Sequence, residues 1–146
     1  MLMRMIVLTS LVAALVAGCG DDGGGGGDAK PTLAGPLTYE RGGGIQGRRD
    51  RLIVQPDHSA KLTTFGKTRE FELKAKEFDS LAAEVEKADL ASVPERSTSP
   101  RPIPDTFGHR IQYDASEITT DDPAIPDELR PLVGRLGGLV QRYEQR

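Results

Sequence analysis

Alternating apolar and polar residues predict a series of β-strands in the chain beyond residue 36. Such alternation places successive side chains on opposite faces of a sheet, which is typical of strands that are buried on one face. Gly66 and Lys67 separate two of these segments and favour a hairpin. Pro56 and Asp57 end another segment with a turn signal. The strands are expected at 37–41, 51–55, 59–65, 68–73, 107–113 and 117–120.

In two later segments the apolar residues recur every three or four positions, which predicts amphipathic helices. The first helix is expected at 75–88, and its apolar stripe consists of Phe78, Leu81, Ala82, Val85 and Ala88. The second is expected to open at Pro126, because a proline in the first turn leaves no N–H group unpaired. Pro131 marks either a kink in this first turn or the true start. The second stripe consists of Leu129, Leu132, Val133, Leu136, Leu139, Val140 and Tyr143.

Together these segments predict an α+β domain over residues 37–146. We expect an antiparallel sheet of five or six strands with two helices packed on one face. The segment 93–105 holds four prolines and no apolar period, so it is expected to be an extended loop between the two halves of the domain.

The first eighteen residues predict a secretory signal peptide. The run 6–17 is apolar apart from Thr9 and Ser10. As a helix it would reach roughly 18 Å, short of the bilayer core of about 30 Å, which fits a signal peptide better than a membrane span. The cleavage region at 16–19 reads Val-Ala-Gly-Cys, which resembles the bacterial lipobox. The alternative is an ordinary secretory signal with an incidental cysteine.

The lipobox resemblance implies that Cys19, the only cysteine of the chain, carries the lipid and becomes the mature N-terminus. The protein would then be a lipoprotein of the cell membrane, anchored at its extracytoplasmic face. The segment 19–36 is rich in glycine and poor in apolar residues, so we expect a flexible tether with a span of roughly 20–25 Å.

Composition narrows the function. The 146-residue chain has a formal net charge of −3, no tryptophan and 5% aromatic residues, which argues against nucleic-acid binding. Its two histidines, His58 and His109, have no nucleophile placed beside them by any motif, so we expect no enzyme; a small enzyme using either histidine is the alternative. The acidic residues at 121, 122, 127 and 128 lack calcium-loop spacing, and we expect neither metal nor cofactor.

Two segments are candidates for binding a protein partner. The glycine run at 42–47 is followed by a strand rather than a helix, which argues against a phosphate-binding loop and favours a glycine-rich hairpin or bulge. The segment 100–104 is stiffened by its prolines. The arginines at 41, 48, 49 and 51 either bind an acidic group or are solvated. The candidate partner-binding residues are Gly43, Gly44, Ile45, Gln46, Pro100 and Pro102.

Three stretches resemble the emfourin-type proteins: TYERGGGIQG at 38–47, IPDTFGHRIQYD at 103–114 and IPDELRPLVGRL at 125–136. Members of that family are small α+β proteins that inhibit protealysin-like metalloproteases, which are related to thermolysin. The resemblance therefore implies a protein-binding domain that inhibits such a protease. The alternative is an envelope structural or assembly lipoprotein without inhibitory activity.

Overall fold

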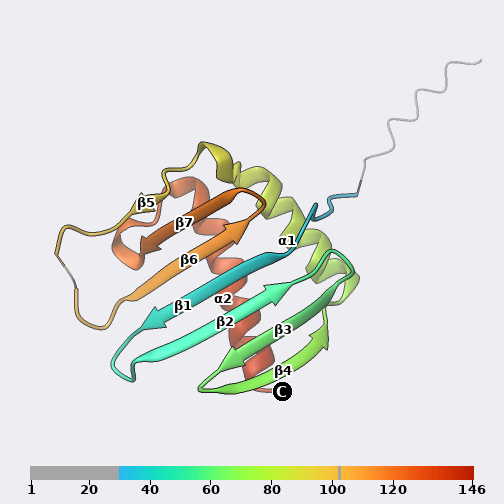
Figure 1. Cartoon of the computed structure of the whole chain (residues 1–146), viewed down its shortest axis with the longest axis horizontal. Coiled ribbons are helices and arrows are strands. Elements are labelled where there is room, and N and C mark those ends of the chain that lie inside the picture. The colour runs from blue at the N-terminus through green and yellow to red at the C-terminus, as the bar shows by residue number, and fades with distance from the viewer. Residues whose placement is uncertain (1–29, 102) are drawn as a thin grey trace, which may run out of the picture.

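A computed structural model describes residues 30–101 and 103–146. Seven strands form one sheet in the order β4-β3-β2-β1-β6-β7-β5 (Figure 1). All neighbouring strands are antiparallel except β5 and β7, which are parallel. The strands are β1 Leu37–Gly43, β2 Arg48–Val54, β3 Ser59–Thr64, β4 Lys67–Glu72, β5 Arg96–Ser97, β6 Phe107–Tyr113 and β7 Ser116–Asp121.

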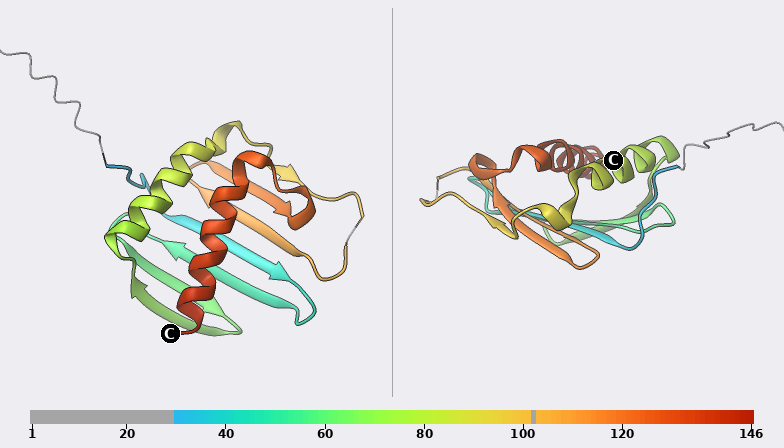
Figure 2. Two further views of the ribbon diagram at one scale, coloured as in Figure 1. Left: turned by 180° about the vertical axis from the view of Figure 1, so that it is seen from behind. Right: turned by 90° about the horizontal axis from the view of Figure 1, so that it is seen from above.

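Helices α1 (Ala75–Ala88) and α2 (Arg130–Glu144) cover one face of this sheet and leave the other open (Figure 2). The predicted α+β fold class is confirmed. Every residue of the two predicted apolar stripes is buried, and the stripes pack against inward-facing strand residues such as Leu37, Leu52 and Ile111. We call the uncovered side of the sheet the open face.

The sheet has one strand more than the five or six expected. The additional strand, β5, lies in the segment that was predicted to be a loop and pairs with β7 through only two residues. A pairing this short has no alternation that a sequence pattern could reveal. The rest of that segment, 93–105, has no strand or helix among its described residues, and a 3₁₀ turn at Leu90–Ser92 precedes it.

Helix α2 begins later than Pro126. A 3₁₀ turn at Asp127–Leu129 precedes it, and Pro131 is the second residue of the helix itself. Pro131 therefore marks the true start rather than a kink, because a proline is accommodated in the first turn, where its missing N–H is not needed.

The folded domain also begins earlier than residue 37. Leu33 is buried in the core at 4% exposure, and the backbone N–H of Ala34 donates to the hydroxyl of Tyr113 at 2.8 Å. Leu33 and Ala34 belong to the segment 19–36 that was predicted to be a tether, so the last residues of that segment contact the domain. Cys19 and Pro102 lie outside the described residues. No described helix is long and apolar enough to span a membrane.

Strand direction places three connections at the same end of the sheet. Strand β1 runs from Leu37, beside the entering chain, to Gly43, where the β1–β2 turn begins. The β3–β4 turn at Phe65 and Gly66 and the loop that leads into Phe107 of β6 lie at that same end (Figure 1). We call these three connections the turn edge.

Candidate functional site

The turn edge carries the large apolar side chains that the fold leaves exposed. Ile45 of the β1–β2 turn is 87% exposed, Phe65 of the β3–β4 turn is 56% exposed, and Ile103 of the loop before β6 is 49% exposed. No other large apolar residue in the described part of the chain is exposed to this degree. Their grouping at one end of the sheet is typical of a docking surface for another protein.

The structure brings the two predicted binding segments together. The backbone N–H of Gly44 in the β1–β2 turn donates to the carbonyl oxygen of Thr106, at the end of the proline-containing loop, at 3.2 Å. Gly43 has a φ of +132°, and a Cβ there would lie 2.4 Å from the same carbonyl. Only glycine fits this position, so Gly43 fixes the turn against the loop.

Of the remaining candidate partner-binding residues, one supports the turn and the others are exposed to solvent. Gly44 packs on the ring of Phe107, since a Cβ on Gly44 would lie 3.1 Å from that ring. Ile45 and Gln46 are exposed and available to a partner, and so is Pro100 on the neighbouring loop. The sequence therefore located the turn correctly, while the supporting residues behind it were not predicted.

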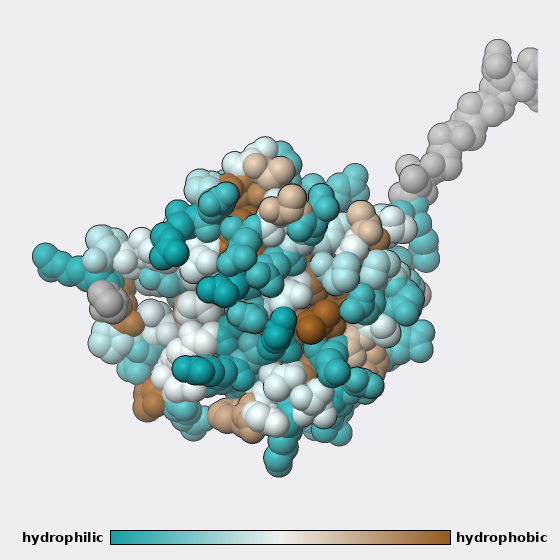
Figure 3. Space-filling view, viewed as in Figure 1, coloured by the Kyte–Doolittle hydropathy of each residue, from teal (hydrophilic) through white to brown (hydrophobic). Residues whose placement is uncertain are grey.

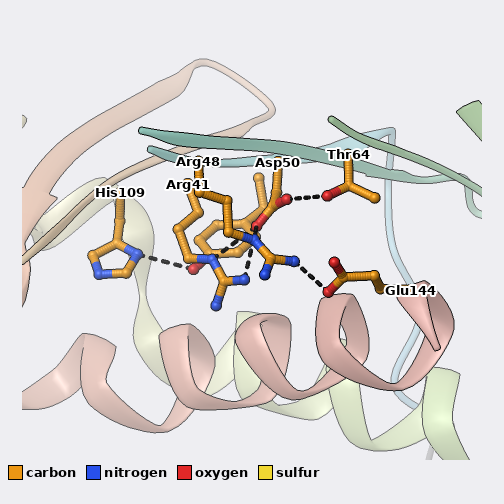
Figure 4. Close-up of polar contacts among 7 residues, drawn as sticks. Arg41, Arg48, Asp50, Thr64, His109 and Glu144 are labelled. Atoms are coloured by element: carbon orange, nitrogen blue, oxygen red, sulfur yellow. Dashed lines mark hydrogen bonds and ion pairs between the residues drawn. The ribbon is translucent and has the colours of Figure 1, made fainter. Parts of the chain in front are cut away.

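That support is a row of polar side chains on the helix-covered face. The residues of the row come from five adjacent strands and lie at directly paired positions, near the strand ends that border the turn edge. Figure 4 shows most of it, seen along the sheet with α2 beneath. From β3 to β7 the row consists of Thr64, Asp50, Arg41, His109 and Thr120.

Asp50 is the centre of this row. Its side chain is fully buried and accepts hydrogen bonds from Arg41 at 2.7 and 3.1 Å, from Arg48 at 2.6 Å and from Thr64 at 2.5 Å. Burial alone would raise the pKa of Asp50. The hydrogen bonds from Thr64, Arg48 and Arg41 outweigh burial and hold this pKa below its usual value.

Arg48 connects the row to both the last helix and the turn edge. Besides Asp50, its guanidinium pairs with Glu144 at the end of α2. Its guanidinium carbon also lies 5.3 Å from the ring centroid of Phe65, within the range of a cation–π contact. Arg48 therefore supports the exposed ring of Phe65, and the carboxylates of Asp50 and Glu144 hold Arg48 in place.

His109 is held in the same row. Its Nδ1 lies 2.9 Å from the Tyr39 hydroxyl, and its Nε2 lies 2.7 Å from Asp122. Asp122 also accepts the backbone N–H of Phe107 at 2.8 Å, which fixes the start of β6. Burial raises the pKa of Tyr39. Both ring nitrogens are thus engaged, and the imidazole links Tyr39 of β1 to Asp122, which follows β7.

His58, the other histidine, lies at the opposite end of the sheet. It belongs to the β2–β3 turn and stacks on Phe78 of α1, with ring centroids 3.9 Å apart. The two histidines therefore do not form one site. Within the described residues no three His, Cys, Asp or Glu side chains converge as a metal site would require.

The arginines of the glycine-flanked segment separate onto both faces of the sheet. Arg41, in the row, and Arg48, which contacts it, lie on the helix-covered face, whereas Arg49 and Arg51 lie on the open face. Sequence reasoning missed Asp50 and Phe65. The available signal for Asp50 was its position among arginines in Arg-Arg-Asp-Arg, and the signal for Phe65 was its position beside the turn residue Gly66.

Comparison of the chain with protein-family models gives no match, and comparison with curated protein sequences gives none either.

Proposed function

We propose that this protein is a lipoprotein, anchored through Cys19 at the outer face of the cell membrane, whose folded domain binds a thermolysin-like metalloprotease through the turn edge and inhibits it. The observation that carries the proposal is the set of three exposed apolar side chains, Ile45, Phe65 and Ile103, on one edge of an otherwise well-buried fold.

Stiffness supports this function. Ordering a mobile loop on binding lowers affinity, so a loop held in place beforehand binds more tightly. The Gly44–Thr106 hydrogen bond joins two connections of the turn edge, and the Arg48–Phe65 contact supports the third. Apolar anchors at the centre of an interface supply most of its binding energy, and Ile45 is the most exposed of the three.

A non-enzymatic role is part of the proposal. His109 is buried and joined to Tyr39 and Asp122, and His58 is packed on Phe78. General base catalysis needs a nitrogen within hydrogen-bond reach of a substrate proton, and both ring nitrogens of His109 already contact Tyr39 and Asp122. The resemblance to emfourin-type proteins supports the choice of partner, since the stretches that carry it include the β1–β2 turn.

The experiment measures inhibition of a panel of secreted thermolysin-like proteases by progress curves. The inhibitor is the mature chain from residue 20, produced without lipid. We expect inhibition by the wild-type domain and weaker inhibition by Ile45→Asp, because a charge at the apolar anchor must be desolvated on docking. Ala91→Asp places the same charge on an exposed residue that follows α1, away from the turn edge, and is the matched control.

Circular dichroism verifies that both variants are folded. If the folded wild-type domain is digested, or has no effect on any of these proteases at micromolar concentration, inhibition is rejected. Crosslinking of the native lipoprotein in membranes then tests the envelope-assembly alternative, in which the turn edge holds another envelope protein.

A further inference from the structure

The open face of the sheet has a shallow depression of about 570 Å³ where β1 and β6 pair. Its floor is formed by two glycines, Gly42 and Gly108, which lie directly opposite each other on these strands. In the space-filling view this part of the open face is pale and bordered by polar side chains (Figure 3). The depression adjoins the turn edge, since Gly66 of the β3–β4 turn also lines it.

The fold itself does not require glycine at either floor position. Neither residue has a positive φ. A Cβ on Gly42 would come no closer than 3.6 Å to another heavy atom, and a Cβ on Gly108 no closer than 3.8 Å, both ordinary contacts. Glycine inside a strand lowers stability, and it commonly marks a place where a ligand approaches the backbone.

The walls of the depression are basic. Arg49 lies opposite Gly42 on β2, and it forms no ion pair with any described residue. Arg51 and Arg110 share one carboxylate, that of Glu40, at 3.4 and 4.0 Å. Arg110 also lies 3.6 Å from Glu117, outside the depression. A chain with a net charge of −3 thus concentrates positive charge here.

We infer that this depression binds a carboxylate side chain, a Glu or Asp, presented by the protein that docks on the turn edge. The carboxylate pairs with Arg49, whose planar guanidinium donates two parallel hydrogen bonds, and the side-chain stem lies on the glycine floor. The inference rests on the proposed function, because the same partner covers the turn edge and the adjoining depression. An acidic contact beside an apolar anchor fixes the orientation of the partner.

The test uses a short peptide with two adjacent glutamates and blocked ends, added to the ¹⁵N-labelled mature chain from residue 20. Amide chemical shifts are followed by NMR. We expect saturable shifts at Gly42, Gly108 and Arg49 in the millimolar range. A peptide with glutamines in place of glutamates is the ligand control and should give none. Because the probe is not the protease, this experiment is independent of whether inhibition is observed.

Two substitutions test the two components of the pocket. Arg49→Gln removes the charge and one of the two parallel hydrogen bonds, while the amide can keep a single uncharged one, and should weaken binding at least tenfold, roughly the effect of losing one charge-assisted hydrogen bond. Gly108→Val fills the floor and should abolish the shifts without lowering the melting temperature, since the site has room and valine favours strands. Arg135→Gln removes an exposed arginine from α2 and is the matched control, with unchanged binding.

The inference is overturned if the glutamate peptide gives no saturable shifts up to about 10 mM, or if Gly108→Val and Arg49→Gln both bind as well as wild type. It is also overturned if free acetate, or vesicles with anionic lipid, shift the same amides as strongly as the peptide, because the site would then recognise a small anion or a membrane surface. Inhibition that fails while peptide binding holds would reject the protease and keep the pocket.

Discussion

The guanidinium of Arg41 and the carboxylate of Asp50 lie opposite each other on β1 and β2, joined by two hydrogen bonds between the sheet and α2. The side chain of Asp50 is fully buried and that of Arg41 is 9% exposed. A charge pair this deep is sensitive to the loss of one member, because the other is left without compensation in a poorly hydrated environment.

Replacing Arg41 by methionine should therefore destabilise the domain by about 3–5 kcal/mol. Asp50 keeps its bond from Arg48, so the lower end of this range is expected. The double variant Arg41→Met with Asp50→Leu should cost less than the sum of the single changes, since neither charge is then buried alone. Urea unfolding of the wild type, the two single variants and the double variant measures this coupling. Strictly additive changes in the free energy of unfolding would show that Arg41 and Asp50 contribute to stability independently of each other.

Stability should fall in acid. The pKa values of Asp50, Asp122 and Glu77 are all held below their ordinary values by hydrogen bonds that outweigh burial. The folded protein therefore binds these protons less readily than the unfolded chain does, so stability is complete above the ordinary carboxyl range, near pH 4–5, and is lost as the pH falls through the lower folded values. Denaturant unfolding between pH 2 and 7 checks this. Asp50→Asn should flatten the dependence.

Truncation should separate the docked part of the tether from the rest. A chain beginning at Lys30 keeps Leu33 and should melt like the longer protein. A chain beginning at Gly35 loses the burial of Leu33, worth about 1.5–3 kcal/mol, together with the hydrogen bond from Ala34 to Tyr113. Thermal unfolding by circular dichroism compares the two. Equal melting temperatures would mean that the contact of Leu33 is not maintained in solution.

Cys19→Ser should abolish lipid attachment, because the thioether to diacylglycerol needs a thiol. Incorporation of radiolabelled palmitate and membrane fractionation measure the loss, and Gly25→Ser is the control for a change in the same segment. Equal labelling of the Cys19 variant would reject the anchor.

The helices were predictable because their information is local: in α1, Phe78, Leu81 and Val85 mark the buried face without reference to any other element. Most of the strands were predictable for the same reason, because the alternation of apolar and polar residues lies within each strand. The candidate site was predictable only in part, since Ile45 stands out in its glycine turn but its neighbours come from elsewhere. The contact of Gly44 with Thr106 and the hydrogen bond of Thr64 to Asp50 depend on strand order and register, which a sequence pattern does not specify.

The described chain enters the domain at Leu33 and Leu37, and the turn edge lies at the far end of β1, about 20 Å away at roughly 3.3 Å per residue. With the lipid on Cys19, as proposed, the chain reaches the domain at the end of the sheet opposite Ile45, so the length of β1 adds to the reach of the tether. A tether of the predicted flexibility leaves the domain free to turn, and Ile45 can then meet a target that lies beyond the tether's own span of roughly 20–25 Å from the membrane.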